Sequence, residues 1–187
     1  PTWYGKIVTA FFGAVTPRTG GFNTIDMTAL SMPMILVYLL LMWIGASPGS
    51  MGGGIRTTTA GVALLNAVSI LRGKDRTEFY NSEISYQSIR KAFAIILLSF
   101  LLIGFFTFLV SVNDGDKGLI RITFETFSAF STTGLSLGIT YDLTAQSKLI
   151  LVLTMFTGRV GMLTIFVAFI KQTKQLYYRY PKEDIAF

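Results

Sequence analysis

The sequence predicts an all-α integral membrane protein that contains two copies of one helical plan. Three observations indicate this fold class. Only 14% of the 187 residues are charged and 51% are hydrophobic, whereas soluble domains carry roughly 25% charged residues. Residues 92–112 contain no charge, and about 20 such residues cross a hydrocarbon core as a helix. Two short glycine-containing stretches, around Gly21 and Gly134, lie 113 residues apart.

The absence of two residue types limits the metal sites and catalytic reactions that the chain could support. The sequence contains no cysteine and no histidine. Without cysteine there is neither a disulfide framework nor a thiolate metal site. Without histidine the commonest metal ligand and the commonest acid–base catalyst are both lacking. We therefore expect no enzymatic activity.

Basic residues give the chain a formal net charge of +6 and concentrate in two groups. The first group is Arg72, Lys74, Arg76, Arg90 and Lys91, and the second is Lys171, Lys174, Arg179 and Lys182. Because Lys and Arg are enriched in cytoplasmic loops of membrane proteins, both groups are assigned to the cytoplasm. A nucleic-acid-binding protein would present a continuous basic face instead, so no nucleic-acid partner is expected. The groups would contact a protein partner or anionic lipid.

The first copy has a short helix, a loop and an interrupted apolar segment. Residues Trp3–Val15 are too few to cross a bilayer as a helix. A proline and a glycine pair should end this helix. The apolar residues 32–46 and 60–71 follow. Residues 33–71 as one continuous helix would reach roughly 58 Å, nearly twice the hydrocarbon thickness. The glycine- and proline-rich stretch 45–54 must therefore interrupt them.

The second copy contains one span more. Residues 88–112 form an outward span, and a turn leads to the short helix Leu119–Phe130. The loop 131–138 follows, and the apolar residues 149–170 return to the cytoplasm. The order of span, short helix, extended loop and span is that of a pore-loop subunit. Its short helix directs a C-terminal end with partial negative charge at the pore axis, which favours a cation.

These elements divide the chain into four parts. Residues 1–72 are the first copy without an opening helix, and residues 73–91 are a cytoplasmic connection. Residues 92–171 are the second copy, and residues 172–187 are a cytoplasmic tail. Because the chain begins with proline and its first copy has no opening span, we expect it to be the C-terminal part of a longer, multi-pass protein.

Specific motifs resemble one transporter family. Residues 16–24 (TPRTGGFNT) and 45–59 (GASPGSMGGGIRTTT) resemble the third repeat of the Trk/Ktr/HKT potassium transporters. Residues 124–136 (FETFSAFSTTGLS) and 158–161 (GRVG) resemble the fourth. Residues 179–183 (RYPKE) resemble the C-terminus of the KtrB type in particular. The resemblance covers nearly the whole chain and implies four such repeats around one pore.

The resemblance also implies a filter in which main-chain carbonyl oxygens replace the hydration shell of potassium. The residues that would line it are Thr19, Gly20, Gly21 and Phe22 from the first copy and Thr132, Thr133, Gly134 and Leu135 from the second. Potassium channels carry a second glycine after the aromatic residue of their signature. Asn23 and Ser136 stand at that place here, so we expect fewer ion sites and a less strict preference for potassium over sodium.

The interrupting stretch has two interpretations. Its residues of interest are Gly45, Ser47, Pro48, Gly49, Gly52, Gly53 and Gly54. They could form a flexible kink between two helices. They could instead form a gate below the filter, since glycines lower the cost of a conformational change. The resemblance favours the gate.

Charged residues at membrane depth also need a role. Arg159 lies midway along the final apolar segment, where a charge costs at least about 2.5–3.5 kcal/mol on insertion scales. It either pairs with Glu125 or faces the pore and repels cations, as the resemblance implies. Glu125, when ionised, would attract potassium; when protonated, it would donate a hydrogen bond behind its loop. Arg18 is expected to brace its loop, and Arg56 to anchor the gate or to snorkel.

By resemblance, the full protein takes up potassium passively through a gated, channel-like pore in the cell (inner) membrane, with sodium as a modulator. Its partners would be membrane lipid, N-terminal repeats of the same polypeptide, a second copy in a homodimer and a cytoplasmic nucleotide-binding regulatory subunit. Two other functions stay open. One is a secondary transporter with its substrate site at the broken helix. The other is a non-conducting membrane assembly protein whose glycines allow close helix packing.

Overall fold

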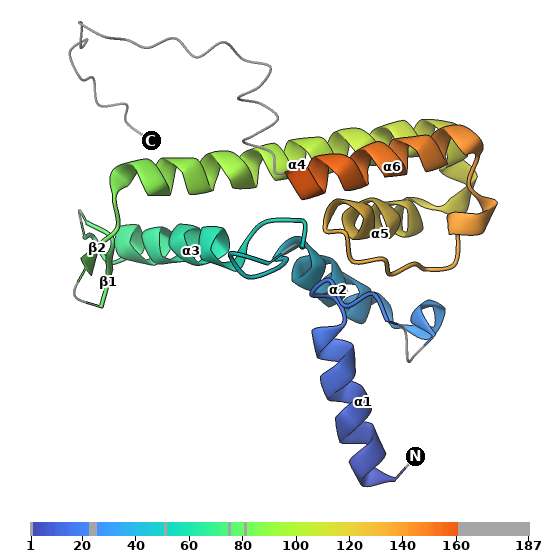
Figure 1. Ribbon diagram of the computed structural model, residues 1–187, viewed down its shortest axis with the longest axis horizontal. Coiled ribbons are helices and arrows are strands. Elements are labelled where there is room, and N and C mark those ends of the chain that lie inside the picture. The colour runs from blue at the N-terminus through green and yellow to red at the C-terminus, as the bar shows by residue number, and fades with distance from the viewer. Residues whose placement is uncertain (1, 23–25, 51, 75, 81, 161–187) are drawn as a thin grey trace, which may run out of the picture.

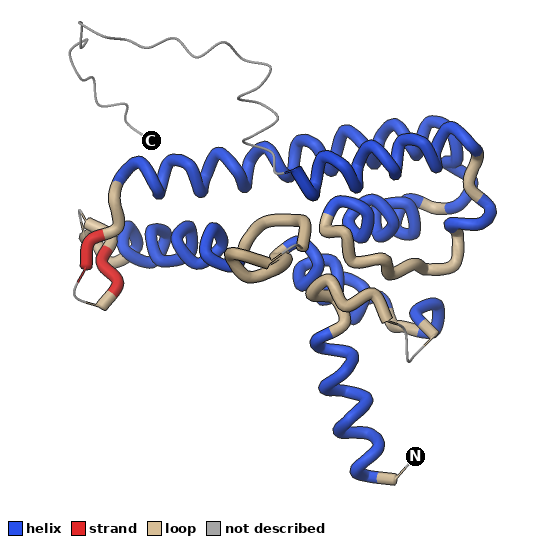
Figure 2. Tube along the Cα trace, in the orientation of Figure 1, coloured by secondary structure: helices blue, strands red, loops and turns tan. Residues whose placement is uncertain are grey.

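The computed structural model describes residues 2–22, 26–50, 52–74, 76–80 and 82–160, and these residues are mostly helical (Figures 1 and 2). The six α-helices are α1 (Trp3–Val15), α2 (Met32–Trp43), α3 (Thr57–Leu71), α4 (Tyr86–Asp114), α5 (Leu119–Phe130) and α6 (Ala145–Val160). The 3-10 helices are η1 (Met27–Ala29), η2 (Gly115–Lys117) and η3 (Thr140–Asp142). A two-stranded antiparallel hairpin is formed by β1 (Glu78–Phe79) and β2 (Ser82–Glu83).

Helix α4 forms the long axis of the molecule (Figure 1). The Ser85 side chain caps its N-terminus by accepting a hydrogen bond from the Ser88 N–H at 3.3 Å. With η2 it makes a helix of 32 residues, in which the most apolar stretch of 18 residues has a mean hydropathy of 2.8. In the part of the chain that the structure describes, this is the one helix long and apolar enough to cross a membrane. The final span predicted over residues 149–170 begins inside α6 and runs beyond the described residues.

The packing joins the two copies. Helices α4, α5 and α6 contact one another, α3 runs along α4, and α2 contacts α5 (Figure 1). Seven buried residues from both copies form the central cluster: Met27, Ile35, Tyr38, Met42, Phe124, Leu135 and Leu137. Helix α1 projects away from the bundle and has no buried residue. The Tyr38 hydroxyl ties its C-terminal part to α2 by donating to the Gly13 carbonyl at 2.9 Å.

The 113-residue spacing of the sequence persists in the structure. Helices η1 and η3 begin at Met27 and Thr140, and α2 and α6 begin at Met32 and Ala145. Each pair is offset by 113 residues. From the 3-10 helices η1 and η3 to the starts of α2 and α6, the two copies therefore keep one register, without insertion or deletion.

The copies differ at the residue before these 3-10 helices. Asp26 caps η1: its carboxylate accepts hydrogen bonds from the Thr28 hydroxyl at 2.7 Å and from the Thr28 N–H at 2.9 Å. These bonds, the hydroxyl bond foremost, hold the pKa of Asp26 below its ordinary value. The register position in the second copy is Ile139, which is buried in an apolar cluster instead.

Several predicted boundaries need correction. Helices α1 and α5 have the predicted bounds, but α6 begins at Ala145 and not at residue 149. Similarly, α4 begins at Tyr86, so the end of the segment assigned to the 73–91 connection is helical. The all-α expectation also missed the β1–β2 hairpin inside that connection. The predicted bounds were taken from the apolar residues alone. Helices α4 and α6 also include a polar first turn, so each begins earlier than its apolar part.

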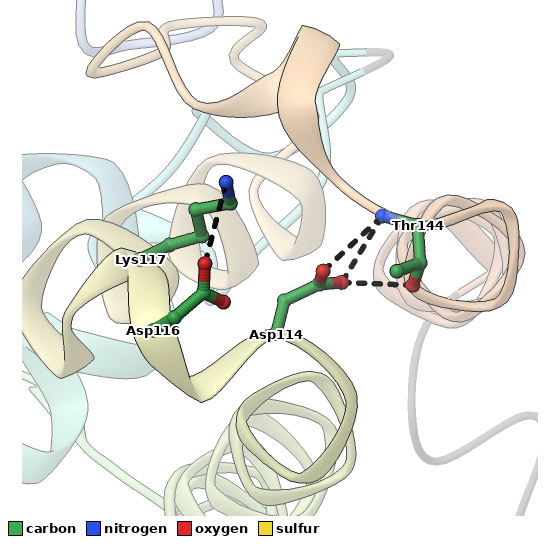
Figure 3. Close-up of polar contacts among 4 residues, drawn as sticks. All are labelled: Asp114, Asp116, Lys117 and Thr144. Carbon is green, nitrogen blue, oxygen red and sulfur yellow. Dashed lines mark hydrogen bonds and ion pairs between the residues drawn. The ribbon is translucent and has the colours of Figure 1, made fainter.

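Asp114 explains why α6 begins early (Figure 3). Its side chain is 4% exposed. Its carboxylate accepts hydrogen bonds from the Thr144 N–H at 3.1 Å and from the Thr144 hydroxyl at 2.8 Å. Thr144 directly precedes α6, and its hydroxyl accepts from the Ser147 N–H at 3.3 Å. The end of α4 thus fixes the start of α6.

We expect Asp114→Ala to destabilise the protein by about 1–2 kcal/mol, because it removes the acceptor of these bonds from a buried helix start. The measurement is thermal unfolding of the purified full-length protein in detergent. Asp114→Asn keeps an acceptor oxygen and should retain part of the stability. Asp116, which is largely exposed and contacts only Lys117 in Figure 3, provides the control Asp116→Ala. An equal loss in both alanine variants would contradict this role.

Candidate functional site

The two predicted filter loops lie in contact. We call residues 16–22 the first loop and residues 131–138 the second loop. A methyl group on Gly21 would lie 2.5 Å from the Thr133 carbonyl oxygen, and one on Gly134 would lie 4.0 Å from the Gly21 Cα atom. The Thr133 hydroxyl also donates to the Pro17 carbonyl at 3.2 Å. Two glycines 113 residues apart therefore face each other at van der Waals distance.

Both loops adopt one backbone pattern. The φ angle is 60° at Thr19 and 54° at Thr132, and it is 70° at Gly21 and 85° at Gly134. Positive φ is uncommon for a residue with a side chain and strained for a β-branched one. Its recurrence at both threonines, in the same register, indicates that the surrounding packing imposes this shape on both loops.

In the second loop buried and accessible residues alternate. The side chains of Ser131, Thr133, Leu135 and Leu137 are each at most 4% exposed, whereas Gly134 is exposed. The Ser131 hydroxyl donates to the Phe127 carbonyl at 2.7 Å and lies 2.8 Å from the Thr133 hydroxyl. Side chains thus anchor the loop to the protein and leave the main chain at Gly134 uncovered.

The first loop is anchored differently. Its Thr16 hydroxyl donates to the Phe22 carbonyl at 3.1 Å, and the Gly20 N–H donates to the Thr16 carbonyl at 3.0 Å. Phe22 is 74% exposed, while Leu135 at the same register position is 2% exposed. The central cluster packs against Leu135, and no such cluster covers Phe22 within the described residues. Arg18, predicted to brace this loop, is exposed.

Glu125 lies behind the second loop. Its side chain is 5% exposed and accepts a hydrogen bond from the Ser136 hydroxyl. Ser136 in turn lies 2.8 Å from the Thr140 hydroxyl and accepts from the Gly138 N–H at 2.9 Å. The register position in the first copy is Phe12, which cannot do this. Sequence reasoning missed Thr140, which no motif marks.

Glu125 makes no ion pair in the described part of the chain. The three ion pairs there are Lys74–Glu78, Arg76–Glu83 and Lys117–Asp116. The alternative in which Arg159 pairs with Glu125 is therefore not found. Arg159 is an exposed residue in the last turn of α6.

We call residues 44–56, between α2 and α3, the gate segment. It folds back on the end of α2: the Gly45 N–H donates to the Ile55 carbonyl at 2.8 Å, and the Ile55 N–H donates to the Trp43 carbonyl at 3.1 Å. The tip around Ser47, Pro48 and Gly49 is a turn, in which the Ser50 N–H donates to the Ser47 carbonyl at 3.1 Å. The predicted interruption of the apolar segment is confirmed.

The gate segment contacts Thr19 in the middle of the first loop and Thr132 at the start of the second. The Gly53 N–H donates to the Thr132 hydroxyl oxygen at 2.9 Å. A methyl group on Gly53 would lie 2.9 Å from the Phe130 carbonyl oxygen, and one on Gly52 would lie 2.9 Å from the Thr19 Cγ2 atom. Gly54 lies against Ser131. The segment therefore sits directly against the threonines at which the first and second loops begin their positive-φ pattern.

The end of α5 joins the gate segment to α6. Gly158 packs directly on the Phe130 carbonyl, the same oxygen that lies close to Gly53. Arg159 follows Gly158 in the chain. Gly158 stands 113 residues after Gly45, but the contacts of the two glycines differ, because Gly45 lies against the Gly53 carbonyl. Arg56 is exposed and precedes the first turn of α3.

Comparison with protein families identifies one match. The TrkH family model, described as a cation transport protein, matches residues 4–178. This span covers most of the chain, including both loops, the gate segment and α6.

Individual relatives agree with the family match. The chain is 39% identical to the Ktr system potassium uptake protein B of Bacillus subtilis, over 96% of this chain and 40% of that protein. It is 35% identical to the Ktr system potassium uptake protein D of the same organism, over 98% and 41%. It is 34% identical to the potassium/sodium uptake protein NtpJ of Enterococcus hirae, over 98% and 42%. The chain thus spans about two fifths of the length of these relatives.

Proposed function

Because the chain belongs to the TrkH family of cation transport proteins, we propose that it forms part of a gated, channel-like pore through which potassium enters the cell. The names of two relatives, which specify potassium uptake and potassium/sodium uptake, support potassium as the cargo. In this proposal sodium acts as a modulator. The observation that carries the proposal is the contact of the first and second loops in one backbone pattern.

The filter would use the uncovered main chain of both loops. In a regular strand the carbonyl groups of successive residues point to opposite sides of the chain. When every second residue has a positive φ, the carbonyl groups of successive residues instead point to the same side of the chain. Positive φ at residues 19 and 21, and at residues 132 and 134, has this spacing. Carbonyl oxygens arranged in this way can replace the hydration shell of a potassium ion. The first and second loops would each form one quarter of the filter, and they would approach each other most closely at Gly21 and Gly134.

The gate segment would close the pore from below. It contacts Thr19 and Thr132, the first residues with positive φ in the two loops. Its Gly53 N–H donates a hydrogen bond to the Thr132 hydroxyl oxygen. An ion leaving the filter would need that space. Conduction therefore requires the segment to move away, and its many glycines lower the cost of doing so.

Two charged residues would shape the field along the path. Glu125 holds the second loop through Ser136 and, when ionised, adds to the attraction for a cation. Arg159 follows the glycine that contacts Phe130 beneath the loop and would repel cations until the gate segment moves.

The proposed surroundings follow the expectations from the sequence. The full protein would be a multi-pass protein of the cell (inner) membrane, with residues 73–91 and 172–187 in the cytoplasm. Further repeats of the same polypeptide would complete the filter, and the protein would form a homodimer that binds a nucleotide-binding regulatory subunit. The names of two relatives as proteins of a Ktr system support such partners.

One observation favours a second candidate, a transporter that rocks around a broken helix. The apolar segment is interrupted between α2 and α3, where such transporters bind substrate. Saturable flux coupled to a second solute would support this candidate, and flux that follows the electrochemical gradient without saturation would contradict it.

The experiment that tests the filter is Gly134→Ser in the full-length protein. A serine at φ 85° costs about 1–2 kcal/mol and distorts the second loop, although the added Cβ atom meets no close neighbour. We expect potassium uptake to fall or sodium to enter more readily, measured as ion flux into proteoliposomes. Gly118→Ser is the matched control, because Gly118 lies outside both loops, has a similar φ of 88° and leaves open space for a side chain. Unchanged flux and selectivity in Gly134→Ser would contradict the filter.

A further inference from the structure

A surface groove lies where the two copies meet at the end of α4. Its volume is about 520 Å³, and it is lined by residues of η1 and α2 from the first copy and of η2, α5 and the second loop from the second copy. The floor is apolar and includes Met32, Ile35, Leu119, Ile120 and Leu137. Neither the filter nor the gate uses this groove.

The rim of the groove is cationic. Lys117 and Arg121 both line it. Lys117 is 29% exposed at its side chain and lies 3.4 Å from the Asp116 carboxylate, which is itself 72% exposed. Arg121 is exposed and makes no ion pair in the described part of the chain. The lining itself holds no carboxylate: Asp116 pairs with Lys117, and Asp26 accepts hydrogen bonds from Thr28 beside the groove. Arg121 is therefore left as a cation without an ion-pair partner among the described residues.

The groove adjoins the end of the helix that is long enough to cross a membrane, where lipid headgroups are expected. Its cationic residues follow directly on the helix that is long enough to cross a membrane, which ends at Lys117. The apolar floor extends along α2, a helix of apolar residues with much exposed surface. A free phosphate ion would complement the charges of Lys117 and Arg121 but would not cover the apolar floor. A phospholipid matches both, because its phosphate is anionic and its chains are apolar.

We propose that this groove binds one anionic phospholipid, whose phosphate contacts Lys117 and Arg121 and whose acyl chains lie on the apolar floor between α2 and α5. Ile35 and Leu137 on the floor belong to the central cluster that packs against Leu135 of the second loop. The bound lipid would therefore fill the seam between the two copies next to the packing that supports that loop.

The test measures lipid binding to the purified full-length protein by native mass spectrometry, with phosphatidylglycerol and phosphatidylcholine of the same acyl chains. We expect phosphatidylglycerol to bind more tightly, and Lys117→Gln and Arg121→Gln each to weaken it about fivefold, since one basic residue near a membrane surface contributes about that factor. Lys148→Gln is the matched control: Lys148 is exposed and contacts the Tyr141 carbonyl, away from the groove lining. Its binding should equal that of the wild type.

Two further arms separate the lipid from a free anion. Leu119→Gln makes the exposed part of the floor polar and should weaken phosphatidylglycerol binding, whereas inorganic phosphate should not displace the lipid. Displacement by inorganic phosphate alone, or equal affinity for the two lipids, would overturn the proposal. So would an equal loss of binding in Lys148→Gln and Arg121→Gln. Thermal unfolding of each variant without added lipid verifies that a loss of binding does not come from misfolding.

Discussion

Gly21→Ala is expected to reduce potassium uptake by at least about tenfold. The new methyl group would lie 2.5 Å from the Thr133 carbonyl oxygen, well inside van der Waals contact. Main-chain atoms cannot rotate away as a side chain can, so the two loops must separate. A gap between them would leave a potassium ion with oxygens on one side only, and lost coordination is costly for a dehydrated ion. The measurement is potassium uptake by a potassium-deficient strain that carries the full-length protein.

Gly73→Ala is the matched control for this substitution. The φ angles are similar, 66° at Gly73 and 70° at Gly21, so both alanines carry the strain of about 1–2 kcal/mol that a left-handed conformation imposes. Nothing lies within 4 Å of a methyl group on Gly73. Normal uptake in Gly73→Ala and lost uptake in Gly21→Ala would assign the effect to the contact between the loops. Normal uptake in both, at equal amounts of protein in the membrane, would sink the filter assignment.

Gly53→Ala is expected to have the opposite effect and to raise potassium flux. Its methyl group would lie 2.9 Å from the Phe130 carbonyl oxygen and 3.0 Å from the Thr132 hydroxyl oxygen. The gate segment must then withdraw, and the hydrogen bond from the Gly53 N–H to Thr132 is lost. Overpacking costs typically about 1–3 kcal/mol. A shift of about 1.4 kcal/mol against the closed state would raise the open fraction about tenfold, which flux into proteoliposomes would measure.

The control is Gly61→Ala in the adjoining helix α3, because a methyl group on Gly61 meets nothing within 4 Å. Flux should be unchanged in this variant. If Gly53→Ala left flux unchanged or reduced it in a protein of normal thermal stability, the gate segment would be a structural connection and not a barrier to ions.

Several elements were predictable from the sequence because their signals are local. The bounds of α1 and α5 follow from short apolar stretches that end at proline, serine or glycine. The break after α2 follows from a run of glycines that no helix of membrane length accommodates. The resemblance to the Trk/Ktr/HKT transporters, based on these motifs, is confirmed by the family match over residues 4–178.

Other features could not be read from local patterns. The early start of α6 depends on Asp114, which lies 30 residues before Thr144. The β1–β2 hairpin has two residues in each strand, too few for an alternating pattern. Glu125 had two candidate roles, and only the fold brings Ser136 to its carboxylate.

By itself, the sequence determined the membrane class, the two copies and their register, since hydropathy, helix-breaking residues and repetition are properties of the chain taken a few residues at a time. The tertiary structure alone decided that Gly21 meets Thr133, that Gly53 reaches Thr132 and that α6 rests on the end of α5. Such contacts join residues far apart in the chain, and they depend on how complete helices pack, which no short stretch of residues encodes.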